Sequence, residues 1–186
     1  MTGLGALWLP ILLSAVFVFI ASSLIHMVLP WHKGDYPALP DQDRILEALR
    51  GFSVPPGDYF LPRPANREDM RSAAHVEKMK KGPVLMMTVM PNGVGSMARN
   101  LGQWFVFCLV VSLLAAAVAG AVLPIGADNE YIFRVVGLTS FMGYTLALWP
   151  MSIWYRRSWA LTLKATVDGL IYGVITAGTF GWLWPR

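Results

Sequence analysis

The sequence predicts an all-α integral membrane protein with four transmembrane helices and a small mixed loop region, with two short helices and an extended segment, between helices 1 and 2. The chain is 55% hydrophobic and only 14% charged, whereas a typical soluble domain is about 25% charged. Its apolar residues form four blocks of the length, about 20 residues, that crosses a bilayer. Basic residues and tryptophans gather near the block ends, as in membrane proteins.

The blocks divide the chain into three regions. Residues 1–30 are expected to form the first transmembrane helix, residues 31–95 a cytoplasmic loop region, and residues 96–186 a three-helix transmembrane region. The spans of the last region are expected at about 101–123, 131–151 and 161–184. The start of the first block, Met1 to Ala6, lacks a basic side chain, and its apolar run is longer than the core of a signal peptide. We therefore expect a retained anchor.

The charges predict the orientation, because short loops rich in Lys and Arg stay in the cytoplasm. Most basic residues lie in residues 31–95. The link between spans two and three carries Asp128 and Glu130 without a basic residue, and the next link carries Arg156 and Arg157. Both termini are therefore expected outside and loop 31–95 inside. The same bias explains the net charge of +4 without a nucleic-acid partner. The absence of an organelle targeting signal favours a bacterial inner membrane.

Tryptophans give an independent check, since an indole prefers the headgroup level of a bilayer. Each tryptophan lies near the end of an expected span, on the side of the membrane that the charges indicate. The expected interface anchors, including the basic pair that would meet anionic lipid, are Trp31, Trp104, Trp149, Trp154, Arg156, Arg157, Trp159, Trp182 and Trp184.

Small residues recur every fourth position in span four and predict its packing face, because helices in lipid associate by close backbone approach. A shorter set in span two makes spans two and four a plausible pair. Packing inside the bundle and an interface with a second copy or another subunit both fit the pattern. The positions are Ala165, Gly169, Gly173, Ala177 and Gly181 in span four and Ser112, Ala116 and Gly120 in span two.

The loop region carries its own local signals. Asp41 is expected to cap a short amphipathic helix that stops at Gly51. A proline-rich stretch follows and favours extended or turn structure. Asn66 is expected to cap a helix over residues 67–81, and residues 84–90 form a β-prone run that favours a strand or an extended segment.

Asp168 is the most suggestive single residue, because an ionisable group inside a membrane span is costly and marks function by default. Lys164 precedes it by four residues on the same helical face and could pair with it. A proton or ion pathway and a contact with a partner are the functional alternatives. Our structural hypothesis is that Asp168 fixes the inner end of span four against span one or the loop that follows it.

The histidines raise the question of metal or haem. His26 and His32 flank the inner end of span one, and His75 lies in the loop. The six-residue separation across Pro30 matches no standard metal spacing, and spans two to four hold no histidine that could ligate a haem. We therefore expect no metal and no other cofactor.

No catalytic motif is present, and paired carboxylates are absent from the spans. The sequence thus favours a non-enzymatic accessory or structural subunit of a membrane complex, whose partners are the lipid bilayer and other membrane subunits or further copies of itself. The alternative is a small oligomeric transporter or channel component that uses Asp168.

Overall fold

The computed structural model describes all 186 residues and contains four helical segments long and apolar enough to cross a membrane. They run over Leu4–Val28, Met97–Val122, Asn129–Tyr155 and Trp159–Leu183. The expectation of four such helices is confirmed, and each differs from its expected bounds by at most a turn. The chain divides into two compact units, residues 1–36 with 96–186 and residues 37–95.

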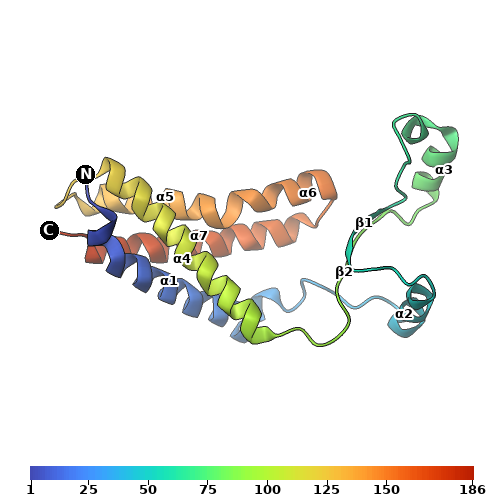
Figure 1. Ribbon diagram of the computed structural model, residues 1–186, viewed down its shortest axis with the longest axis horizontal. Coiled ribbons are helices and arrows are strands. Elements are labelled where there is room, and N and C mark those ends of the chain that lie inside the picture. Colours follow the sequence, from blue (N-terminus) through green and yellow to red (C-terminus); the bar gives the residue numbers. More distant parts are fainter. The chain divides into compact units, whose positions relative to one another are not determined.

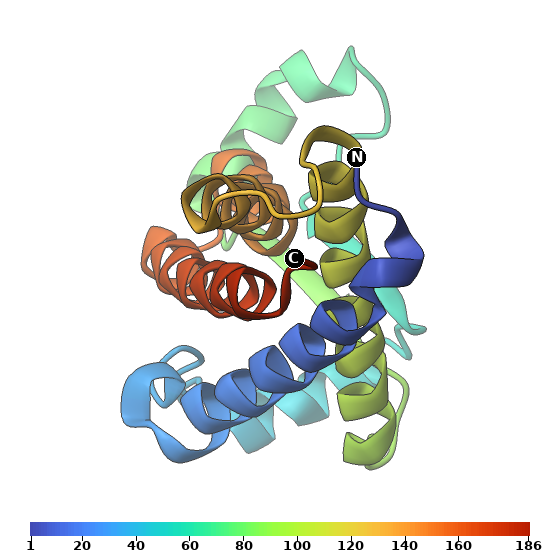
Figure 2. The same cartoon turned by 90° about the vertical axis from the view of Figure 1, so that its left-hand side faces the viewer.

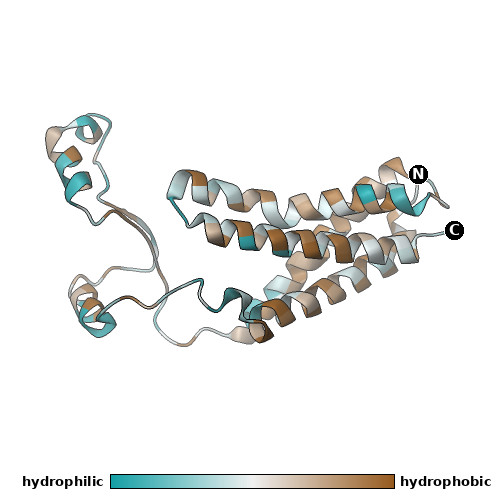
Figure 3. Ribbon diagram, turned by 180° about the vertical axis from the view of Figure 1, so that it is seen from behind, coloured by the Kyte–Doolittle hydropathy of each residue, from teal (hydrophilic) through white to brown (hydrophobic).

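The four-helix unit is an up-and-down bundle with both termini at one end (Figure 1). We call this the terminal end. The opposite, loop end is where span one stops at Val28 and span two begins at Met97. Hydrophobic residues dominate the four long helices (Figure 3).

Span one consists of a 3-10 turn at Leu4–Leu7, α1 (Trp8–Ser23) and one π-helical turn, η2 (Leu24–Val28). Span two is the single helix α4 (Met97–Val122), which Ser96 caps by accepting a hydrogen bond from the backbone N–H of Arg99.

Span three is broken into α5 (Asn129–Thr145), a 3-10 turn at Leu146–Leu148 and α6 (Trp149–Tyr155). The break precedes Pro150, whose ring and missing N–H disrupt a continuous helix. Span four is α7 (Trp159–Leu183).

Each span packs against two neighbours, in the cyclic order α1, α4, α5, α7 (Figure 2). The expected pairing of spans two and four is therefore wrong, because α4 and α7 lie diagonally across the bundle. The small residues of α4 face span one instead. Ser112 accepts a hydrogen bond from Ser14 at 2.9 Å, and the backbone of Gly120 accepts one from the N–H of Thr2 at 2.8 Å.

The small-residue face of α7 packs mainly on α5. A Cβ added at Gly169 would overlap the side chain of Thr145, and one added at Gly173 would lie 3.2 Å from the carbonyl oxygen of Gly137. The methyl group of Ala177 lies against Gly137 as well. Ala165, nearer the loop end, is only partly buried, whereas Gly181 is buried near the terminal end with open space where a Cβ would be.

Residues 37–95 form α2 (Gln42–Gly51), α3 (Ala73–Lys81) and two antiparallel strands, β1 (Gly57–Leu61) and β2 (Leu85–Val89). In the strand pair Tyr59 lies opposite Met87. The proline-rich stretch was expected to be extended or turn-like, and part of it becomes β1 because β2 supplies a partner that starts 28 residues later. Long-range pairing of this kind leaves no mark on local sequence.

Two expected caps of this unit are wrong. Asp41 precedes α2 in a left-handed conformation, and its side chain makes no capping hydrogen bond. Asn66 caps a short 3-10 turn instead of a long helix, by accepting from the backbone N–H of Asp69 at 2.8 Å. The helix itself begins later, where the hydroxyl of Ser72 accepts from the backbone N–H of His75 at 3.1 Å.

The Gly169→Ala variant tests the close packing of α7 on α5. Overpacking against Thr145, which is fully buried, costs about 1 to 3 kcal/mol, and the removal of a helical glycine returns about 0.5 to 1 kcal/mol. We expect a net loss in the free energy of unfolding, measured by denaturant titration in detergent micelles.

Gly178→Ala is the matched control, because Gly178 lies on the same helix with nothing within 4 Å of an added Cβ. It should be neutral or slightly stabilising. Equal stability of the two variants would contradict the packing assignment.

Candidate functional site

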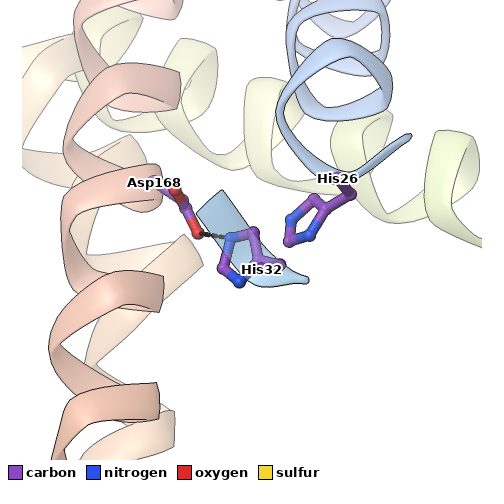
Figure 4. Close-up of side chains that lie close together, drawn as sticks. All are labelled: His26, His32 and Asp168. Atoms are coloured by element: carbon purple, nitrogen blue, oxygen red, sulfur yellow. Dashed lines mark hydrogen bonds and ion pairs between the residues drawn. The ribbon is translucent and has the colours of Figure 1, made fainter. Parts of the chain in front are cut away.

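The candidate site lies at the loop end of the bundle, where the chain leaving span one folds back onto α7. Figure 4 shows His26, His32 and Asp168 close together there. Asp168 comes from α7, His26 from the π-helical turn η2, and His32 from the 3-10 turn η3 (Pro30–His32).

Local backbone geometry brings the two histidines together. Within η2 the N–H of Leu29 bonds to the carbonyl of Leu24 at 3.0 Å, a five-residue step that widens the helix. Leu29 is then extended, as a residue before proline should be, and Pro30 starts the 3-10 turn. The imidazole rings of His26 and His32 consequently stack, with centroids 4.1 Å apart and an angle of 22° between their planes.

The carboxylate of Asp168 is almost completely buried and receives hydrogen bonds from this segment. Its Oδ1 accepts from the indole Nε1–H of Trp31 at 3.1 Å, and its Oδ2 lies 2.8 Å from Nε2 of His32. The side chain is 4% exposed. The contact that the structural hypothesis required, between span four and the loop after span one, is thus present in the structure.

The expected pairing of Lys164 with Asp168 is wrong. The Nζ of Lys164 lies 2.5 Å from Oδ1 of Asp35 and donates to the backbone carbonyl of Trp31 at 2.8 Å. Lys164 is one helical turn nearer the loop end than Asp168, at the level where the returning chain places Asp35. Sequence spacing within α7 could not reveal that a second carboxylate arrives from outside the helix.

Asp35 connects the lysine to the histidine. Its Oδ2 lies 2.6 Å from Nδ1 of His32. Hydrogen bonds from Lys164 and then from His32 hold the pKa of Asp35 below its usual range. His32 therefore lies between two carboxylates, and an imidazolium with a proton on each nitrogen can donate to both.

A cavity of about 460 Å³ opens beside these groups. Its size lies within the range of small-molecule pockets. Aromatic side chains from three spans form part of its wall, and the rings of Tyr144 and Tyr172 meet edge to face at 5.3 Å. Trp104 reaches across the diagonal of the bundle to Tyr172 at 6.1 Å. Polar groups at its rim include Arg157, which donates to the hydroxyl of Tyr36 at 3.4 Å.

Tyr144, one of the residues that line this cavity, carries a hydroxyl that is unpaired within the protein. The side chain of Tyr144 is buried, and its hydroxyl has no hydrogen-bond partner in the protein. The nearby thiol of Cys108 is at best a weak partner. Leaving a buried hydroxyl unpaired costs about 1 to 3 kcal/mol, so this hydroxyl lowers the stability of the cavity wall.

His26, His32 and Asp168 are the only group of three metal-type side chains whose ligand atoms come close together, all within 4.8 Å of one another. The sequence argument against a metal was that the six-residue separation of His26 and His32 across Pro30 matches no standard metal spacing. Pro30, which lies between the two histidines, was the one sequence signal that the chain reverses its direction there. His75 belongs to the other unit, where it is buried in α3.

The expected interface anchors fall into two groups. The side chains of Trp154 and Trp182 are 77% and 70% exposed, and Trp31, Trp149 and Trp159 are also exposed. Arg156 is exposed as well and ends α6 in a left-handed conformation. Trp184 is instead buried, and its indole donates to the carbonyl of Pro124 at 3.0 Å. Trp104 is partly buried and donates to the hydroxyl of Ser22 at 2.7 Å.

Comparison with known proteins gives no assignment. No protein-family model, no curated protein and no solved structure matches the chain. The function must therefore be inferred from the geometry of the chain itself.

The Asp168→Asn variant tests the contact between α7 and the chain after span one. Asparagine keeps the shape but removes the charge that faces His32, and breaking a buried pair costs about 3 to 5 kcal/mol. We expect a loss toward the lower end of this range, because the amide oxygen can still accept from Trp31. Unfolding in detergent, followed by tryptophan fluorescence, measures it.

Glu130→Gln is the matched control, since Glu130 pairs with Arg134 on the exposed surface of α5. This change should alter stability by no more than about 0.5 kcal/mol. If Asp168→Asn were as mild as the control, the buried cluster would not hold the loop end together.

Proposed function

We propose that the chain is a non-enzymatic accessory or structural subunit of a membrane complex. In this proposal it lies in a bacterial inner membrane, with both termini outside and residues 31–95 in the cytoplasm. The observation that carries it is the distribution of polar and apolar groups along the bundle axis.

The core at the terminal end is apolar and closely packed. It combines residues of all four spans with the ends of the chain, and its buried members are Leu7, Ala115, Ala116, Ala119, Leu123, Ile132, Val136, Ala177, Phe180 and Trp184. Water and ions cross a membrane only where polar groups or a wet cavity line the route. A single bundle with this core offers no such route.

The polar groups at the loop end also favour a structural role over conduction. Both oxygens of Asp168 are engaged, and His32 is held between two carboxylates. A proton or ion relay needs groups that exchange partners along a path. Here the hydrogen-bonded groups all lie on α7 and on the chain after span one. They form a local clamp that would fix one surface of the subunit.

A transporter or channel component that uses Asp168 is the alternative. It would require several copies to build a pathway between bundles, because none runs through one bundle. The small residues of α7 do not favour it, since Gly169, Gly173 and Ala177 are already occupied by α5.

Purification from native membranes in a mild detergent tests the subunit role. We expect a second membrane protein to co-purify in a fixed ratio with the tagged chain, as judged by quantitative mass spectrometry. The same membranes with the untagged chain are the control for non-specific capture. A lone homo-oligomer would favour the transport alternative, and a lone monomer would contradict the proposal.

Single-cysteine labelling tests the orientation. In a Cys108→Ala background, which removes the only cysteine, Asp128→Cys places a thiol in the exposed link between spans two and three, and Glu77→Cys places one on the exposed surface of α3. A membrane-impermeant maleimide should label the first variant in intact cells and the second only after permeabilisation. The reverse pattern would contradict the orientation.

A further inference from the structure

We propose that His26, His32 and Asp168 bind a divalent transition-metal ion of the Zn²⁺ class at the loop end of the bundle. The proposal is independent of the subunit role. It rests on the ligand atoms, on the groups that orient them and on the space beside them.

The ligand atoms are close to the separation that coordination requires. Zinc binds imidazole nitrogen and carboxylate oxygen at about 2.0 to 2.2 Å, which places neighbouring donors roughly 3 to 3.5 Å apart. Nε2 of His32 and Oδ2 of Asp168 are already 2.8 Å apart. A metal ion would replace the hydrogen bond between them by two coordination bonds and release the bridging proton.

His26 is the ligand that must move, and it is the freest of the three. Its side chain is exposed, and its one polar contact is a long one of 3.4 Å to the hydroxyl of Tyr172. All the ligand atoms lie within 4.8 Å of one another. Because the lone pairs of an imidazole lie in the plane of the ring, His26 must turn out of its stack with His32 to direct a ring nitrogen at the ion.

The surrounding hydrogen bonds are those of a metal centre. A metal-bound histidine almost always donates its second ring N–H to a carboxylate or carbonyl, which fixes the ring and makes it a better ligand. Nδ1 of His32 lies 2.6 Å from Asp35, and Lys164 in turn fixes Asp35. The indole of Trp31 holds Oδ1 of Asp168 and leaves Oδ2 directed at His32.

The donor set and the cavity define the kind of ion. Two imidazoles and one carboxylate suit Zn²⁺, Co²⁺ or Fe²⁺, whereas Mg²⁺ and Ca²⁺ prefer oxygen ligands. Three protein ligands leave at least one position open, and an open position distinguishes an exchangeable or reactive site from a closed structural one. The cavity of about 460 Å³, which all three residues line, has room for a water or another ligand there.

Titration of the full-length chain in detergent with Co²⁺ tests the proposal, because Co²⁺ occupies zinc-type sites and absorbs visible light. We expect one Co²⁺ per chain at micromolar concentration, displaced by Zn²⁺. His26→Gln should weaken binding more than about 100-fold, and Asp35→Asn about 10- to 100-fold, the range for a lost orienting partner.

His75→Gln is the matched control, since it removes the one histidine outside the cluster, and it should bind Co²⁺ like the wild type. His26 is exposed, so His26→Gln should unfold at the same temperature as the wild type without metal. Failure of the wild type to bind Co²⁺ at micromolar concentration would overturn the proposal. Equal affinity of His26→Gln and the wild type would also overturn it.

Discussion

A single buried carboxylate, that of Asp168, constrains the whole loop end of the bundle. An ionised group at this position of a membrane-spanning helix needs partners, because its desolvation is expensive. Its own helix supplies none of them. The partners come from Trp31 and His32, so the chain must leave span one, reverse at Pro30 and lie across α7. The π-helical turn and the 3-10 turn on either side of Leu29 provide that path.

The two ends of the bundle are built on different physical principles. Near the termini an apolar core excludes water, and the backbone of Gly120 lies so close to that of Thr2 that an added Cβ would overlap it. At the loop end, larger aromatic side chains separate the helices, and a cavity remains between them. Charged groups, among them Asp35, Arg157 and Asp168, gather around that cavity. This asymmetry favours binding at one membrane face over passage through the bundle.

The clamp and the proposed metal site share residues without conflict. In the metal-free chain His32 bridges Asp35 and Asp168, and Lys164 also pairs with Asp35. With an ion bound, Asp35 still orients His32, and Asp168 changes from hydrogen-bond acceptor to ligand. The contacts of Trp31 and Lys164 persist in both states, so the fold of the loop end does not depend on the ion.

The sequence alone determined the four helices that are long and apolar enough to cross a membrane, since blocks of apolar residues need no long-range information. It also singled out Asp168, because an ionisable group inside a membrane span is energetically costly. The recurring glycines of α7 likewise predicted a close-packing face. Only the tertiary structure decided that α7 packs on α5 and α1 and not on α4, and that Lys164 turns to Asp35. Helix periodicity relates residues within one helix, whereas the site joins three segments across two backbone irregularities. The sequence spacing of His26 and His32 therefore did not reveal that their side chains lie together beside Asp168.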